Sequence, residues 1–141
     1  MNSQKSETEK MHGKSYLDIL VVEDDRMLRR VMVLQLAADF AVRSANNGAE
    51  ALKLIAEHVP SVLVLDVGLP DMTGLEVIEQ LRQNVATCSI PVIVHTTLDL
   101  SSEQQTHFKL GPTRCITKTT ALSDRLAELI LELLEEQKCT P

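Results

Sequence analysis

The sequence predicts an α/β protein in which a doubly wound, five-stranded parallel sheet carries five helices on its two faces. Short aliphatic runs recur along the chain, and apolar runs without polar alternation are typical of strands covered on both faces. Between these runs lie segments whose apolar residues recur at steps of three and four, as in amphipathic helices. Since strand and helix alternate five times, right-handed crossovers bring the strands parallel into one sheet.

Five runs are the expected strands, and each of them ends on polar residues. In chain order they are LDILVVE (17–23), FAVRS (40–44), SVLVLD (61–66), PVIVHT (91–96) and RCITK (114–118). The second and the fifth are the weaker strand candidates.

The helices are predicted from start signals and from apolar spacing. Three begin at a capping box, in which a side-chain oxygen caps the first turn and a glutamate or glutamine reaches back: Asn47 with Glu50, Thr73 with Glu76, and Ser101 with Gln104. The first helix follows Asp25, and its apolar side carries Leu28, Val31, Met32 and Leu36. The last helix repeats Leu122, Leu126, Leu129, Ile130, Leu133 and Leu134.

Length and composition predict one folded domain over residues 16–137. Residues 1–15 are polar and are expected to form a disordered N-terminal extension, and residues 138–141 a short C-terminal tail. The chain has 141 residues, 2% aromatic residues and a net charge of -6, so we expect no nucleic-acid partner. The three cysteines form no CxxC pair, and no signal peptide or membrane-length apolar run is present. A soluble, cytoplasmic protein without a membrane partner is expected.

Charged and hydroxyl side chains stand where the expected strands end. The first strand ends in Glu23-Asp24-Asp25, the third in Asp66, and the fourth and fifth in Thr96-Thr97 and Thr117-Lys118. The carboxyl ends of parallel strands share one rim, so these groups should converge. Two carboxylates about 5 Å apart repel by roughly 3 kcal/mol at an effective dielectric of 20. Such a cluster favours binding of a hard divalent cation, Mg²⁺ or Mn²⁺. The open coordination positions of this cation could bind the oxygens of a phosphoryl group.

Four segments, LVVEDD, LVLDVGLPDMTG, PVIVHTT and ITK, lie in an order and at a spacing that resemble the receiver domain of two-component response regulators, over about residues 16–137. The resemblance implies a flavodoxin-like fold with strand order 2-1-3-4-5. It also implies that Asp66 is the phospho-acceptor. A histidine kinase or a histidine phosphotransfer protein would then donate the phosphoryl group, and the receiver would catalyse only its own phosphorylation and dephosphorylation, so it is not expected to be an enzyme acting on other substrates.

The same resemblance implies the roles of the residues around Asp66. Asp24 would be the main acidic metal ligand, Glu23 would contribute directly or through water, and the backbone carbonyl of Gly68 would complete the protein ligands. Thr96 would hydrogen-bond a phosphoryl oxygen, and Lys118 would pair with the phosphate. Two positions depart from the family pattern: Thr119 stands where a proline is usual, and Cys115 where an aromatic residue is usual.

Several alternatives remain open from the sequence. Asp25 is better suited to cap the first helix than to bind metal. His95 is expected to be a hydrogen-bonded structural residue in preference to a catalytic one, and Cys115 a small buried hydrophobe in preference to a redox sensor. A non-phosphorylated docking module, or a receiver cut from a hybrid histidine kinase, is the alternative function. A small Mg²⁺ phosphatase ranks last, because Gly68 supplies no second acid.

Two further expectations concern signalling. Output should pass through contact with another protein, at the face formed by the fourth helix, the fifth strand and the fifth helix. The resemblance also implies that the side chains two residues after Asp66 and two after Thr96 flank the phosphoryl group. Here they are Gly68 and Leu98, which offer no polar group to orient an attacking water, so the phosphorylated state should be long-lived.

Overall fold

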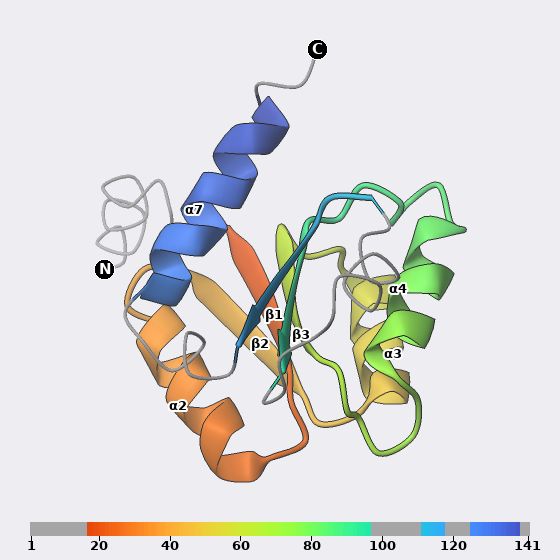
Figure 1. Ribbon diagram of the computed structural model, residues 1–141, viewed down its shortest axis with the longest axis horizontal. Coiled ribbons are helices and arrows are strands. Elements are labelled where there is room, and N and C mark those ends of the chain that lie inside the picture. The colour runs from red at the N-terminus through yellow and green to blue at the C-terminus, as the bar shows by residue number, and fades with distance from the viewer. Residues whose placement is uncertain (1–16, 97–110, 118–124, 139–141) are drawn as a thin grey trace, which may run out of the picture.

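The computed structural model describes residues 17–96, 111–117 and 125–138, and these residues form a parallel α/β sheet with helices on both sides (Figure 1). The strands pair in the order β2-β1-β3-β4-β5, and every pairing is parallel. The predicted fold class and strand order are therefore confirmed. In chain order the elements are β1 (Asp18–Val22), α2 (Arg26–Leu36), β2 (Ala41–Ala45), α3 (Gly48–Glu57), β3 (Val62–Asp66), α4 (Gly74–Arg82), β4 (Val92–Thr96), β5 (Thr113–Thr117) and α7 (Arg125–Lys138).

Two apolar layers hold the sheet between its helices. Figure 1 shows α2 and α7 on one side of the sheet and α3 and α4 on the other. Side chains alternate along each strand, so neighbouring residues of β3 enter different layers: Val64 packs with the α2 and α7 residues, and Leu65 with those of α3 and α4. All of β3 is buried, as expected for a central strand covered on both faces.

The helix starts agree closely with the predicted caps. Asp25 caps α2 by accepting a hydrogen bond from the Leu28 amide, and Thr73 and Glu76 form a complete capping box at α4. At α3 the Asn47 side chain caps the Glu50 amide, but the Glu50 carboxylate accepts from the Asn46 amide and so reaches one residue further back than predicted.

The first helix buries a narrower side than predicted. Val31 was expected on the buried side of the first helix, but it is 37% exposed. It lies one residue before the buried Met32, so the buried stripe of α2 is narrower than the apolar pattern suggests. The helix expected to start at Ser101 lies outside the described residues. Within the described residues, no helix has the length and apolarity needed to cross a membrane.

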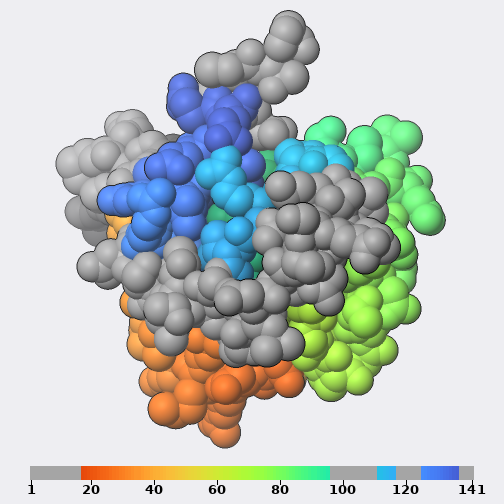
Figure 2. Space-filling model, viewed as in Figure 1, coloured from red at the N-terminus to blue at the C-terminus, as the bar shows by residue number. Residues whose placement is uncertain are grey.

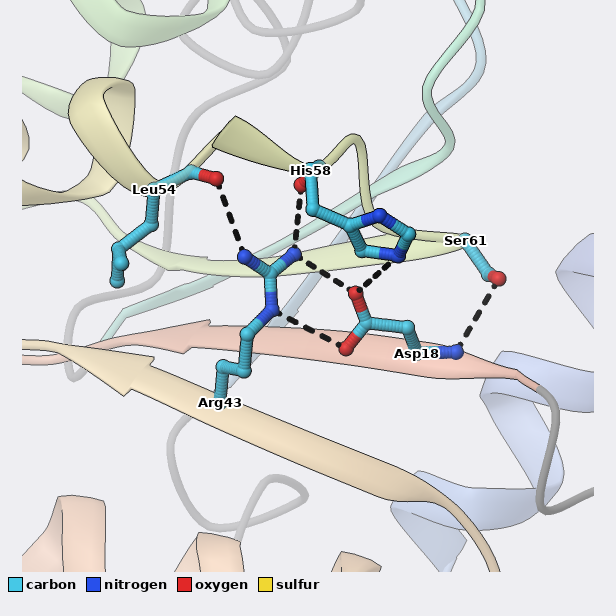
Figure 3. Close-up of polar contacts among 5 residues, drawn as sticks. All are labelled: Asp18, Arg43, Leu54, His58 and Ser61. Atoms are coloured by element: carbon cyan, nitrogen blue, oxygen red, sulfur yellow. Dashed lines mark hydrogen bonds and ion pairs between the residues drawn. The ribbon is translucent and has the colours of Figure 1, made fainter. Parts of the chain in front are cut away.

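Arg43 on β2 joins the start of β1 to the end of α3 (Figure 3). Its guanidinium donates to the Asp18 carboxylate, with Nη2 at 2.7 Å from Oδ2, and to the backbone carbonyls of Leu54 and His58 at 3.1 and 2.7 Å. The His58 ring also lies beside Asp18, with Nε2 at 3.4 Å from Oδ2. The Arg43 guanidinium therefore donates hydrogen bonds to backbone carbonyls at the C-terminal end of α3, where positive charge is favoured.

Arg82 fixes the start of β5 from the last turn of α4. Its guanidinium donates to the backbone carbonyl of Ile90 at 2.7 Å and to the Thr113 hydroxyl at 3.2 Å. Partial burial lowers the pKa of Arg82 from its usual value, and the backbone carbonyls compensate part of the lost hydration. Since Lys118 follows β5 directly, this anchor contributes to the position of the strand that leads to it.

Candidate functional site

Glu23 and Asp66 lie side by side where β1 and β3 end. Val22 and Leu65 are partners in the parallel register, so the residues that follow them, Glu23 and Asp66, stand level at the carboxyl ends of the two strands. Glu23 is 0% and Asp66 3% exposed. Two carboxylates of the predicted cluster are therefore brought together in a nearly water-free position, which is costly unless a cation or donors compensate them.

Glu23 is held in place by the first turn of α2. Its Oε2 accepts from the backbone amide of Asp25 at 2.9 Å, and its backbone carbonyl accepts from Nη1 of Arg29 at 2.8 Å. Because Asp25 also caps the helix through its own side chain, the Glu23-Asp24-Asp25 turn has a fixed conformation. The expectation that Asp25 is a helix cap is confirmed.

A tight loop follows Asp66 and closes back on the strand end. The Gly68 amide donates to Asp66 Oδ1 at 3.2 Å, and the Gly74 amide donates to the Val67 carbonyl at 2.9 Å. A Cβ on Gly74 would lie 3.0 Å from the Asp66 carbonyl oxygen, so the close return of the chain favours glycine there. The loop thus presents the Asp66 carboxylate from a well-defined turn.

Asp71, in the same loop, was not singled out from the sequence. Its two carboxylate oxygens accept from the amides of Gly48 and Ala49, each at 2.8 Å, at the first turn of α3. These backbone hydrogen bonds lower the pKa of Asp71 below 3.8. Asp71 is separated from Gly48 by 23 positions in the sequence and from Ala49 by 22, so no local sequence pattern predicts the contact. The only indications in the sequence are an acidic residue in the β3–α4 loop and a helix start whose amides need acceptors.

His95 is the second residue whose place was missed. It is the register partner of Asp66 on β4 and is 0% exposed. Its Nδ1 lies 3.6 Å from Oε1 of Glu23. One ligand atom from each of Glu23, Asp66 and His95 can be chosen so that all three lie within 4.8 Å of one another. The sequence shows that His95 stands next to Thr96. That its side chain lies beside the carboxylates depends on the register between β3 and β4, which the sequence does not show.

The remaining predicted site residues are placed less fully. Asp24 and Gly68 are exposed on the rim beside the buried pair. Thr96 ends β4 and pairs in register with Thr117. Lys118 lies outside the described residues, as do Thr97, Leu98 and Thr119. Cys115 packs against the core layer of α3 and α4, but it is half-buried and not buried as expected.

The donor set fits a divalent cation of the kind that the carboxylates predict. Two buried carboxylates with exposed Asp24 and the Gly68 loop beside them supply hard oxygen ligands on one side, and the exposed rim leaves room for water or a phosphoryl oxygen. A bound cation would offset the repulsion between Glu23 and Asp66.

Comparison with known proteins decides the family. Residues 19–130 match the model of the response regulator receiver domain. The chain belongs to this family. Among curated relatives it is 38% identical over 112 residues to the response regulator MprA of Mycobacterium leprae, a match that covers 79% of this chain and 48% of the relative. The match to MprA of Mycobacterium avium has the same identity and coverage. The chain thus spans about half the length of the curated relatives it matches.

Solved structures agree with this receiver assignment. The receiver domain of a signal transduction histidine kinase from Syntrophus aciditrophicus is 27% identical, with a TM-score of 0.74, and the match covers 88% of this chain and 94% of that one. The chemotaxis response regulator CheY4 of Vibrio cholerae is 26% identical, with a TM-score of 0.70, over 81% of this chain and 98% of that one. The receiver fold and a role in two-component signalling follow, and the family generally binds Mg²⁺ at acidic residues.

Proposed function

We propose that this receiver accepts a phosphoryl group on Asp66 from a phosphohistidine. The observation that carries the proposal is the pair formed by Asp66 and Glu23 at the carboxyl ends of β3 and β1, in a chain that matches the receiver family. An isolated carboxylate would gain nothing from burial at a strand end. A buried strand end beside a second carboxylate is a suitable position for a carboxylate that acts as a nucleophile next to a bound cation.

The chain's own residues would divide the work as follows. Glu23, Asp24, Asp66 and the backbone carbonyl of Gly68 would hold Mg²⁺ or Mn²⁺, and its charge would stabilise the negative charge that develops on the phosphoryl group. An Asp66 oxygen forms the new bond to phosphorus, the phosphorus–nitrogen bond of the donor breaks, and the leaving imidazole takes up a proton. Thr96 would hydrogen-bond a phosphoryl oxygen, and Lys118 would pair with the phosphate.

The orientation of the nucleophile has a structural basis. The Gly68 amide donates to Asp66 Oδ1, which restricts rotation of the carboxylate. Glu23 is held by the Asp25 amide, so the two carboxylates keep a constant separation. Preorganisation of this kind lowers the barrier because the reacting groups need no rearrangement when the donor arrives.

The donor should be a histidine kinase or a histidine phosphotransfer protein, and we infer that it contacts α2. This helix starts directly after the Glu23–Asp25 turn, and it forms the lower end of the face in Figure 2. Three of its apolar side chains, at spacings of four and three residues, are exposed: Met27 at 75%, Val31 at 37% and Leu34 at 64%. Exposed apolar side chains gathered next to a reactive site favour a protein contact there.

Signal output would pass to another protein whose identity the receiver alone does not specify. A receiver that forms part of a hybrid histidine kinase is the second candidate, supported by the likeness to the Syntrophus aciditrophicus kinase receiver. A docking module without phosphorylation is favoured only by Cys115 and Thr119, the two departures from the family pattern.

The test is phosphorylation by acetyl phosphate followed by intact mass measurement and peptide mapping. With Mg²⁺ present the protein should gain one phosphoryl group on Asp66, and chelation of the metal should prevent the gain. Asp66→Asn should remain unmodified, whereas the matched control Asp25→Asn, which retains a helix-capping side chain, should be labelled normally. Labelling without a divalent cation, or on a different residue, would contradict the proposal.

A further inference from the structure

His95 projects from the same face of the sheet as the two buried carboxylates. Val21, Val64 and Ile93 pack in one core layer with α2 and α7. Each of these residues stands two positions before Glu23, Asp66 and His95 respectively, and side chains two apart on a strand share a face. The three polar residues therefore extend one row of three adjacent strands, with β3 in the middle.

The geometry of this row is close to that of a metal-binding triad. Ligand atoms bound to one cation at about 2.1 Å lie about 3.0 to 3.4 Å apart in octahedral or tetrahedral arrangements. His95 Nδ1 and Glu23 Oε1 are 3.6 Å apart. One ligand atom from each of Glu23, Asp66 and His95 can be chosen so that the three lie within 4.8 Å of one another. Small side-chain rotations would bring all three onto a common ion.

The nitrogen donor changes which cation such a site prefers. Mg²⁺ takes oxygen ligands almost exclusively, whereas imidazole suits Zn²⁺, Co²⁺ and their first-row neighbours. The imidazole of His95 is fully buried, so bulk water would not compete with it for a bound metal on that side. Carboxylate oxygens with one buried nitrogen form a mixed donor set of borderline softness.

We propose that His95 is a third protein ligand on the sheet side of the receiver's cation site, so that this receiver binds transition-metal cations such as Zn²⁺ and Co²⁺ in preference to Mg²⁺. The inference rests on the proposed function for the presence of a cation at Asp66. Excess Mg²⁺ would still support phosphorylation through the oxygen ligands. The competing explanation is that His95 only contacts Glu23 and keeps it in place.

Metal titrations separate the two explanations. Binding of Co²⁺, Zn²⁺ and Mg²⁺ is measured by calorimetry, and the Co²⁺ absorption spectrum reports on the ligand atoms. His95→Leu should weaken Co²⁺ and Zn²⁺ binding by about tenfold or more while changing Mg²⁺ binding by about twofold at most. It should also alter the Co²⁺ spectrum. If His95 only holds Glu23 in place, His95→Leu should weaken the binding of all three cations by the same factor and leave the spectrum of the bound Co²⁺ unchanged.

His58→Leu is the matched control. His58 also lies beside a carboxylate, Asp18, but it is largely exposed and its partner stands at the beginning of β1, whereas Glu23 follows the end of that strand. This variant should retain the metal affinities and the Co²⁺ spectrum of the unaltered protein. If it loses Co²⁺ binding as His95→Leu does, the assignment to His95 is wrong.

Nitrogen NMR of the histidine rings tests the assignment in the unaltered protein and does not depend on any variant folding. Addition of Zn²⁺ should shift the ring nitrogen resonances of His95, and unchanged resonances at saturating Zn²⁺ would overturn the proposal. Acetyl phosphate labelling with Mg²⁺ is run in parallel on the unaltered protein and on His95→Leu. Absence of label on Asp66 in the unaltered protein would count against the proposed function, whereas normal labelling with equal loss of all cations in His95→Leu would count against the role of His95 alone.

Discussion

The carboxylate of Asp71 accepts a hydrogen bond of 2.8 Å from the backbone amide of Gly48, and so links the loop after β3 to the start of α3. The Ala49 amide donates to the second oxygen of the same carboxylate. Met72, the next residue of the loop, lies so close to Gly48 that a Cβ there would be 2.4 Å from its Cγ. A side chain larger than hydrogen at position 48 would therefore require the Met72 side chain to move.

Asp71→Ala should destabilise the protein at neutral pH, because the Gly48 and Ala49 amides in the first turn of α3 lose their hydrogen-bond acceptor. The pKa of Asp71 is lowered by the Gly48 and Ala49 amides, so the stabilisation exists above the ordinary value of 3.8 and is lost as pH falls through the lower folded-state pKa. Urea denaturation should thus show a difference between the two proteins that is constant near neutrality and shrinks below about pH 3.8. Glu79→Ala, at an exposed carboxylate of α4, should show little effect; a difference that grows in acid would contradict the prediction.

Much of this architecture could be predicted because it depends on local patterns. The β3 run and the Thr73 capping box are written in consecutive residues, and both were confirmed. The place of His95 depends on the register between β3 and β4, and that of Asp71 on a contact across 23 positions, so neither is encoded locally. The assignments of Thr96 and Lys118 came from a family resemblance and stay predictions.

Arg43→Met should lower the free energy of unfolding by about 2 to 3 kcal/mol, because hydrogen bonds to a charged group are worth more than neutral ones and the Asp18 carboxylate loses its partner. The substitution keeps the apolar stem of the side chain and removes the donors to Leu54 and His58. Chemical denaturation provides the measurement.

A double-mutant cycle with Asp18→Asn isolates the ion pair of Arg43. Its coupling free energy should be smaller than the total effect of Arg43→Met, since the carbonyls at the end of α3 account for the remainder. A coupling free energy equal to the total would show that these carbonyls contribute nothing.

Met27→Ser and Leu34→Ser should slow phosphoryl transfer from a protein donor without slowing labelling by acetyl phosphate. If α2 is the donor contact, loss of an exposed apolar anchor should reduce the second-order rate constant about fivefold to thirtyfold, equivalent to about 1 to 2 kcal/mol. The measurement is transfer from the histidine kinase or phosphotransfer protein that labels the receiver fastest. Val85→Ser is the control, because Val85 is 94% exposed in the turn after α4. Equal slowing with acetyl phosphate would indicate damage to the site, and no slowing in either α2 variant would place the donor elsewhere.

Gly68→Asn should accelerate loss of the phosphoryl group from Asp66. The Gly68 amide donates to Asp66 Oδ1, so the backbone of position 68 lies beside the carboxylate that is modified. Nothing lies within 4 Å of a Cβ built at Gly68, and its backbone is not in the left-handed region, so asparagine fits without strain. Its amide can orient a water for attack on phosphorus, a role that glycine cannot fill, and the expected gain in the hydrolysis rate is about tenfold or more.

The lifetime of the phosphorylated state is followed after removal of acetyl phosphate, with Mg²⁺ present. The unaltered protein should keep its phosphoryl group far longer than Gly68→Asn, and Leu98→Glu provides a second test at a position outside the described residues. Gly68→Ala is the matched control, since it fills the same open space without a polar group and should leave the rate unchanged. If alanine accelerates hydrolysis as much as asparagine does, backbone flexibility and not water positioning controls the lifetime. Loss of phosphate from the unaltered protein within seconds would refute the expectation of a long-lived signal.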